Sequence, residues 1–329
     1  MAIHIGRREF FVALGGAAAW PLVIRAQQPG KLRTIGFSGQ STRSAESELV
    51  AAFSQRLREL GWTEGRTITT EYRWGEGREE RFAQIAAEFV RLKIDVIVTS
   101  GTPQVLATKQ ATSVIPIVFA RVGDPVASRL VASLARPGGN VTGLSSQSDD
   151  LAGKRLEVLR EVVPSLHRVA ILANVGNPLS VLELSEAQAA ARMLNLEFDT
   201  LEIRQAEDIT HAFEAIKDRA EALYVCPDGL MDTNKTRINT LALGARVPTM
   251  HGYREYVEAG GLLSYGANLP EMYRRAADYA DRILRGANPG DMPVEQPTKF
   301  DLIIYLTTAK ALSLTIPESL LLRANELIE

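Results

Sequence analysis

The sequence has too few cysteines and histidines to suggest a disulfide framework or a metal site. Its 329 residues include one cysteine, Cys226, and four histidines that lack the spacing of zinc ligands. A single cysteine cannot form an intrachain disulfide. Cys226 follows the apolar run "ALYV", a context typical of a buried structural thiol. We therefore expect no metal and no cofactor.

A strong charge of either sign is also missing. The chain has 37 basic and 39 acidic residues, a formal net charge of -2 and a pI near 6.2. Because nucleic-acid-binding domains usually present a basic face, no nucleic-acid partner is expected. The N-terminal apolar stretch, residues 10–24, is broken by two glycines and Pro21, and it is too short to span a membrane as a helix.

Residues 1–26 predict an export signal. Arg7 and Arg8 precede this apolar stretch in a pattern that resembles a twin-arginine signal, and Ala26 is small enough for a cleavage position. An ordinary amphipathic helix is the alternative. We expect export to the periplasm, removal of the signal, and no stable membrane insertion afterwards.

Recognisable catalytic motifs are absent. The sequence has no G-x-S-x-G elbow, no Walker loop and no G-x-G-x-x-G after its first expected strand. Asp228 and His251 could support acid–base chemistry, but no nucleophile accompanies them. The sequence therefore predicts a protein that is not an enzyme, and an enzyme that uses Asp228 and His251 is the less favoured alternative.

Strand-like and helix-like segments alternate from Leu32 onward. In the first half, strands are expected at 33–38, 67–74, 94–100 and 115–120, and helices at 46–62, 78–92 and 104–112. In the second half, strands are expected at 167–174, 196–203, 222–227, 247–250 and 261–266, and helices at 180–195, 206–220, 232–243 and 270–286. Parallel strands need long crossover connections, so this alternation predicts parallel sheets of an α/β fold.

Two lobes are expected on either side of the stretch 136–148, which is rich in proline, glycine and serine. The N-terminal lobe would cover 30–145 and the C-terminal lobe 146–298. The tail, 299–329, contains one more strand-like run and two short helices. We expect it to cross back and complete the N-terminal lobe.

Ligands of open parallel sheets bind beyond the carboxyl ends of the strands. The polar residues that follow the expected strands are therefore the candidate ligand-binding residues: Ser41, Thr42, Thr102, Asp124, Asn174, Asn177, Asp228, His251, Tyr253, Tyr265 and Asn268. Each also has a structural explanation, because Ser, Thr, Asp and Asn before a helix commonly cap it. "GDPV" illustrates the choice: Asp124 can begin a helix, contact a ligand, or do both with different carboxylate oxygens.

Several segments resemble the solute-binding proteins of one ABC-transporter family, the tryptophan/tyrosine-type substrate-binding proteins. They include "EYRWGEGREERF", "VTSGTPQVLATKQAT", "IPIVFARVGDPVASRLVASLARPGGNVTGLS" and "LPEMYRRAADYADRILRGANPGDMPVEQP". The resemblance implies the type I periplasmic-binding fold, with two doubly wound parallel-sheet lobes, three hinge crossovers and an ABC permease as partner. It places Thr42, Thr102, Asp124, Asn174, Asn177, Asp228 and Asn268 on cleft loops. Some members have an aspartate where this chain has Asn268.

The resemblance and the cleft residues together predict a periplasmic receptor that delivers a small molecule to an ABC importer. An amino acid, aromatic ones included, or a related aromatic compound is the expected ligand. Asp124 or Asp228 would pair with a cationic group, and Tyr253 or Tyr265 would stack on a ring. A monomer without a lipid anchor is expected. A small-molecule sensor for a signalling partner is the alternative function.

Overall fold

The computed structural model describes residues 32–216 and 219–329. The expected export signal, 1–26, lies outside the described residues. Within them, no helix combines the length and apolar character needed to cross a membrane.

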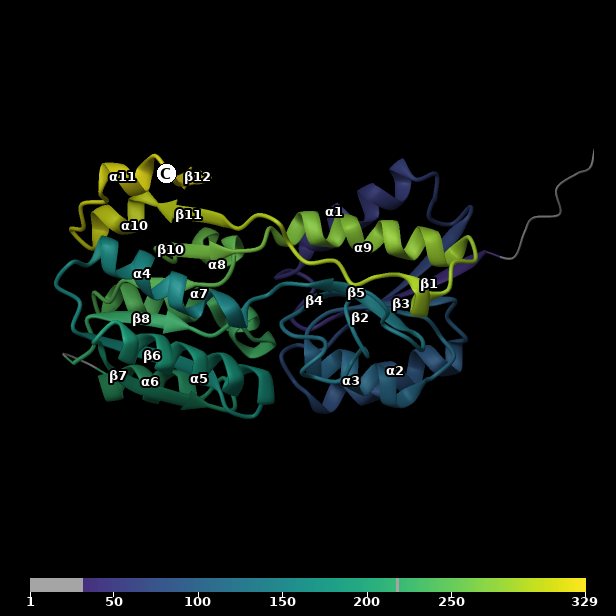
Figure 1. Ribbon diagram of the computed structural model, residues 1–329, viewed down its shortest axis with the longest axis horizontal. Coiled ribbons are helices and arrows are strands. Elements are labelled where there is room, and N and C mark those ends of the chain that lie inside the picture. The colour runs from purple at the N-terminus through teal and green to yellow at the C-terminus, as the bar shows by residue number, and fades with distance from the viewer. Residues whose placement is uncertain (1–31, 217–218) are drawn as a thin grey trace, which may run out of the picture. The chain divides into compact units, whose positions relative to one another are not determined.

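The first lobe is built on a five-stranded sheet in the order β2-β1-β3-β4-β5, and every neighbouring pair is parallel. Its strands are β1 (Arg33–Gly39), β2 (Ile68–Trp74), β3 (Val96–Thr99), β4 (Ile117–Val122) and β5 (Val141–Ser145). Its helices are α1 (Ser47–Glu59), α2 (Glu80–Leu92), α3 (Thr102–Ala111) and, from later in the chain, α9 (Leu269–Leu284). Helices α1 and α9 pack together on one side of the sheet, and α2 and α3 pack together on the other (Figure 1).

The second lobe is built on a seven-stranded sheet in the order β12-β11-β10-β9-β8-β6-β7. Its strands are β6 (Arg168–Asn174), β7 (Glu197–Ile203), β8 (Ala222–Val225), β9 (Thr249–His251), β10 (Leu263–Gly266), β11 (Asp301–Tyr305) and β12 (Glu326–Ile328). Its helices are α4 (Ala152–Val162), α5 (Pro178–Met193), α6 (Asp208–Ile216), α7 (Gly229–Gly244), α8 (Arg254–Glu258), α10 (Leu306–Ala311) and α11 (Glu318–Leu321). Two 3₁₀ turns complete the chain: η1 (Asp149–Leu151) and η2 (Pro289–Asp291).

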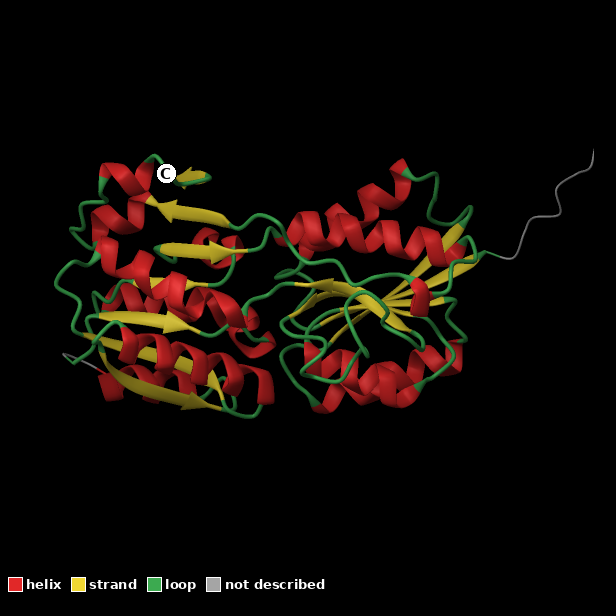
Figure 2. Ribbon diagram, viewed as in Figure 1, coloured by secondary structure: helices red, strands yellow, loops and turns green. Residues whose placement is uncertain are grey.

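Both lobes share one strand order. β7-β6-β8-β9-β10 repeats the order β2-β1-β3-β4-β5 of the first lobe, and β11 is added antiparallel to β10. Helices flank both sheets (Figure 2), so the central strands β3, β4 and β8 are buried along their whole length. The predicted pair of doubly wound α/β lobes is confirmed.

Three segments cross between the lobes. They connect β5 to η1, β10 to α9, and η2 to β11. Two of them run side by side, where the Ser145 N–H donates to the Glu295 carbonyl at 2.9 Å and Leu144 bridges to Glu295. The multi-crossover hinge is therefore present as predicted.

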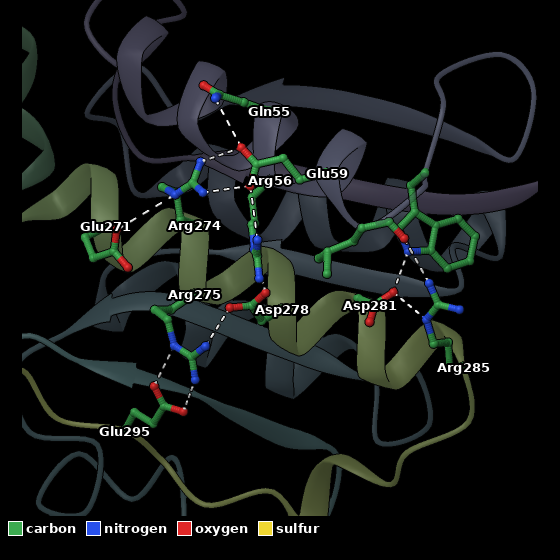
Figure 3. A network of polar contacts seen from close by, with 12 residues as sticks. Gln55, Arg56, Glu59, Glu271, Arg274, Arg275, Asp278, Asp281, Arg285 and Glu295 are labelled. Atoms are coloured by element: carbon green, nitrogen blue, oxygen red, sulfur yellow. Dashed lines mark hydrogen bonds and ion pairs between the residues drawn. The ribbon is translucent and has the colours of Figure 1, made fainter.

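Helix α9 packs on the first lobe although it follows the strands of the second. Figure 3 shows the polar contacts that accompany this packing. Arg274 pairs with Glu59 of α1 at 2.7 Å, and Arg56 of α1 pairs with Asp278 at 2.8 Å. Buried Tyr273 also lies against Phe37 of β1. The predicted second lobe, 146–298, is thus interrupted, because the apolar face of α9 covers the sheet β3-β4-β5.

The tail does not complete the first lobe. β11 pairs with β10, and β12 pairs with β11, so residues 301–328 extend the second sheet. Arg254 of α8 fixes the last strand by a two-pronged contact with Glu326 at 2.7 and 2.8 Å. The strand-like pattern of 300–305 was sufficient to predict a strand but could not show which sheet edge accepts it, because both lobes end in an open edge.

Residues 136–148 contain strand β5 in addition to the predicted crossing. Val141–Ser145 is buried throughout. Gly143 lets the strand lie against β4, since a Cβ at this position would lie 2.0 Å from the Phe119 carbonyl oxygen. Glycine and serine, which favour a loop in the sequence, are here the small residues that permit close strand packing.

The segment after Asp124 forms turns where the sequence favours a helix. Residues 125–129 are turn-like, and Arg129 has a left-handed backbone with φ of 57°. The N–H groups of Leu130 and Val131 both turn back to the Pro125 carbonyl, at 2.9 and 3.2 Å. The chain does not continue as a helix here, and the side chains of Leu130 and Val131 are instead buried in an apolar cluster of the first lobe.

Candidate functional site

A cavity lies between the two lobes at the carboxyl ends of their parallel strands. Its internal volume is about 50 Å³, and about 440 Å³ lies free of protein atoms when the adjoining open solvent is included. The residues that line it are Gln40, Gly101, Thr102, Pro103, Arg121, Gly123, Ser146, Ser148, Asn177, Glu183, Pro227, Asp228 and Tyr253. This is the edge where open α/β sheets bind ligands, because loops and helix N-termini meet there.

The first lobe contributes the N-terminus of α3 to the cavity wall. Thr102 is the first residue of this helix, is 2% exposed, and lines the cavity. Its hydroxyl has no hydrogen-bond partner among the described residues, and Gly101 before it has no side chain with which to cap the helix. The wall therefore offers a hydroxyl and the positive end of a helix dipole to an anionic group.

The second lobe contributes a carboxylate on the opposite wall. Asp228 is 7% exposed and begins α7, where its carboxylate accepts from the Leu230 N–H at 2.8 Å. Asn174 and Asn177 donate their side-chain amides to it at 3.0 and 2.7 Å. Burial raises the pKa of Asp228, and these three donors only partly oppose that effect. No cationic side chain among the described residues pairs with Asp228, so only these three donors and the N-terminus of α7 balance its charge.

A second acidic residue of the cavity wall, Glu183, is already neutralised. Arg155, which is fully buried, donates to Glu183 Oε1 at 2.7 Å, and the Tyr224 hydroxyl donates to the same oxygen at 2.8 Å. Ser148 donates to the other oxygen at 3.0 Å. Burial raises the pKa of Glu183 in spite of the Arg155 charge. This group therefore serves to fix the floor of the cavity.

Direct polar contacts join the two lobes beside the cavity. Arg121 of β4 donates through Nη2 to Asp232 Oδ2 of α7 at 2.6 Å, and both side chains are about 10% exposed. The Ser41 hydroxyl meets the Thr233 hydroxyl at 2.9 Å. These contacts connect the β1 and β4 ends of the first lobe to one helix of the second, and they hold the lobes closed over the cavity.

Four of the candidate residues line this cavity: Thr102, Asn177, Asp228 and Tyr253. Asn174 supports the same wall through its bond to Asp228. Ser41 lies at the contact between the lobes, where it is fully buried.

Thr42 and Asp124 lie outside the cavity lining and make local contacts. The Thr42 hydroxyl bonds to that of Ser44 at 3.1 Å. Asp124 is exposed, and its Oδ1 accepts from the Val126 and Ala127 N–H groups at 2.8 and 2.9 Å. It therefore caps a turn, in line with the structural explanation of "GDPV", and it borders a neighbouring hollow of the surface.

His251, Tyr265 and Asn268 are also placed away from this cavity. His251 is fully buried and stacks on Tyr256 at 4.8 Å, and burial lowers its pKa to about 3. It is therefore neutral and does not form an acid–base pair with Asp228. Tyr265 packs on Phe300 at 6.1 Å. Asn268 caps α9 and lines a separate hollow beside the crossovers.

Sequence reasoning missed Gln40, Arg121 and Glu183. Arg121 interrupts the apolar run "IVFARV" of a strand whose every residue is buried, and an unexplained charge in such a run was the available signal. Glu183 lies within α5, where the sequence suggests a solvated helix face. Among the described residues, no group of potential metal ligands clusters in this cavity or elsewhere.

The chain matches a known family over most of its length. The family model described as ABC transporter substrate binding protein matches residues 42–328. A curated relative, the tyrosine-binding protein of Clostridioides difficile, is 26% identical over 284 residues, which cover 86% of this chain and 82% of that protein.

Solved structures of similar proteins have the same fold. A conserved domain protein from Vibrio cholerae is 29% identical with a TM-score of 0.84, covering 90% of this chain and all of that one. A domain from Streptococcus pneumonia in complex with L-Trp is 23% identical with a TM-score of 0.83, over the same shares. The fold is thus that of type I periplasmic-binding proteins. The chain belongs to the ABC transporter substrate-binding protein family.

Proposed function

We propose that this protein is the periplasmic receptor of an ABC importer and that its ligand is an α-amino acid bound between the lobes. The main observation behind this proposal is that one wall of the cavity offers a negative group and the opposite wall offers hydrogen-bond donors. Asp228 presents a buried carboxylate without a cation, and Thr102 with the α3 N-terminus presents donors without an acceptor. An α-ammonium at Asp228 and an α-carboxylate at Thr102 would complete both walls.

The comparisons support an amino-acid ligand through the names of relatives. One relative is named for tyrosine and one structure contains L-Trp. The import role follows the family, whose members deliver solutes to an ABC permease. We extend this to a monomeric receptor in the periplasm that closes on its ligand without catalysing a reaction.

Titration calorimetry with refolded, ligand-free protein and the twenty amino acids tests the ligand class. We expect at least one α-amino acid to bind with one-to-one stoichiometry, and the matching acid that lacks the ammonium to bind at least about 10-fold more weakly. In Asp228→Asn this discrimination should disappear. Silence toward every amino acid, or discrimination retained in Asp228→Asn, contradicts the proposal.

Export is tested separately. Replacing both Arg7 and Arg8 by lysine should retain the protein in the cytoplasm if residues 1–26 act as a twin-arginine signal. Cell fractionation and N-terminal sequencing of the mature protein measure the outcome. Unchanged periplasmic delivery by the double variant would argue against that route.

A further inference from the structure

Arg121 lies in the cavity wall, but the proposed binding of an α-amino acid through Asp228 and Thr102 gives it no contact with the ligand. It projects from β4, is 8% exposed, and lines the cavity. Its Nη2 donates to Gln40 of the first lobe at 2.7 Å and to Asp232 of the second at 2.6 Å. For Nε and Nη1, the described part of the chain provides no hydrogen-bond acceptor. The guanidinium therefore retains donors for an acceptor inside the cavity.

Arg121 also covers the only aromatic ring among the described residues that line the cavity. Its guanidinium lies 5.2 Å from the ring centroid of Tyr253, a cation–π distance. Tyr253 is 3% exposed, and its hydroxyl reaches Ser146 at 3.3 Å. With Arg121 over one face and only 3% of the residue exposed, Tyr253 offers little ring area on which an indole or phenol of a ligand could stack.

The rest of the lining is unusually polar for a site that would hold an aromatic side chain. Its other members are glycine, proline, serine, threonine, asparagine, glutamine and acidic residues, and Pro103 and Pro227 provide its only aliphatic side chains. Most small-molecule pockets bury apolar ligand parts against hydrophobic walls. An aromatic ring here would remove polar groups from water without replacing their hydrogen bonds.

The position of Arg121 is fixed. Gln40 can reach it because residue 101 is glycine: a Cβ at Gly101 would lie 1.8 Å from Gln40 Nε2. Asp232 is itself held by the Tyr256 hydroxyl at 2.6 Å. Contacts from both lobes and from the Tyr253 ring therefore hold the guanidinium in this position.

We infer that Arg121 determines specificity and restricts the ligand to α-amino acids with a short side chain that carries an oxygen acceptor, such as a hydroxyl, amide or carboxylate. This inference rests on the proposed function, which supplies the sites for the α-ammonium and α-carboxylate. The free donors of Arg121 recognise the side-chain oxygen. The chain would thus differ in ligand from the relatives associated with tryptophan and tyrosine.

Calorimetry of the refolded full chain with L-Ser, L-Thr, L-Asn and L-Asp, against L-Trp, L-Tyr and L-Phe, tests the ranking. The best member of the first group should bind at least about 10-fold more tightly than any aromatic amino acid. Tighter binding of an aromatic amino acid overturns the inference and leaves the proposed function standing. Binding of no amino acid at all overturns the proposed function as well.

The double variant Arg121→Met, Asp232→Asn tests the residue. The Asp232→Asn change avoids a stranded buried charge and keeps an acceptor for the Tyr256 hydroxyl, while the Arg121→Met change removes the donors and uncovers the Tyr253 ring. We expect binding of the oxygen-bearing ligand to weaken at least about 10-fold and the disadvantage of aromatic ligands to shrink by a similar factor. An unchanged ranking overturns the assignment.

Two further variants keep this test decisive. Arg73→Met is the matched control, because Arg73 pairs with Glu88 within the first lobe and lies outside the cavity lining. Its ligand ranking should equal that of the wild type. If the double variant fails to fold by circular dichroism, the single variant Arg121→Lys, which keeps the charge but loses the planar donor set, takes its place with the same expected direction.

Discussion

The buried carboxyl of Glu46 should make the stability of this protein fall as the pH rises toward neutrality. Glu46 precedes α1 and is 3% exposed. Its Oε1 accepts from the Ser41 N–H at 2.7 Å, but Oε2 is buried and has no hydrogen-bond partner among the described residues. Burial raises its pKa from 4.5 to about 7, against the opposing Ser41 N–H and the Arg121 charge.

The sign follows from proton binding. The folded state holds the Glu46 proton more tightly than the unfolded state, so unfolding free energy decreases as pH rises from about 4.5 to about 7. At about 1.36 kcal/mol per pKa unit, the full effect is about 3 kcal/mol. Glu46→Gln removes the charge and keeps an acceptor for Ser41, but it buries an amide donor without a partner, at a cost of about 1–2 kcal/mol. The net gain at pH 8 should be about 1–2 kcal/mol.

Urea unfolding of ligand-free protein at pH 5 and pH 8 measures this effect. The wild type should lose about 2.5 kcal/mol more than Glu46→Gln between the two pH values, because a small part of the effect is already lost at pH 5. Glu255, whose pKa burial also raises to about 7, remains in both proteins and cancels in the comparison. Glu48→Gln is the control, because Glu48 lies in the first turn of α1, two residues after Glu46, and its side chain is 62% exposed. Parallel pH dependence of the wild type and Glu46→Gln would refute the reasoning.

Two further substitutions separate structural roles from binding roles. Asp124→Ala removes the turn cap and should lower stability by about 1 kcal/mol, while ligand affinity by calorimetry stays unchanged because Asp124 lies outside the cavity lining. A loss of affinity would restore Asp124 to the ligand site. Arg155→Met leaves the buried Glu183 carboxylate without its cation and should cost about 3–5 kcal/mol of unfolding free energy. Adding Glu183→Gln should recover part of this loss in urea unfolding, and no recovery would contradict the proposed neutralisation.

The fold was largely predictable because its information is local. Alternating buried strands and amphipathic helices identify the parallel sheets, and the turn-rich stretch marks the first crossover. Assignment of α9 and of the tail to a lobe depends on which sheet face or edge remains uncovered, and this is a property of the assembled chain. The apolar stripe of α9 would suit either lobe, and its selection of the first is visible only in contacts such as Arg274 with Glu59.

The candidate site was predictable only where its residues follow strands. That rule identified Thr102, Asn177 and Asp228, because parallel strands end at one edge of a sheet. It could not identify Arg121, because this residue lies within strand β4 and it is its long side chain that reaches the cavity. It also included Asn268, which follows β10 yet caps a helix that crosses to the other lobe.

The contrast between Asp124 and Asp228 shows what decides whether a capping residue can also contact a ligand. Both follow a buried strand, and each accepts the N–H of the residue two positions later at 2.8 Å. Asp228 is followed by a helix of 16 residues, which fixes the position of its carboxylate. Two asparagine side chains also donate hydrogen bonds to this carboxylate. After Asp124 the chain turns away, and the carboxylate remains exposed. Capping geometry is therefore compatible with either role. Because α7 also carries Asp232, which pairs with Arg121 of the other lobe, the helix that holds a carboxylate without a cationic partner is the same element that closes the cavity over it.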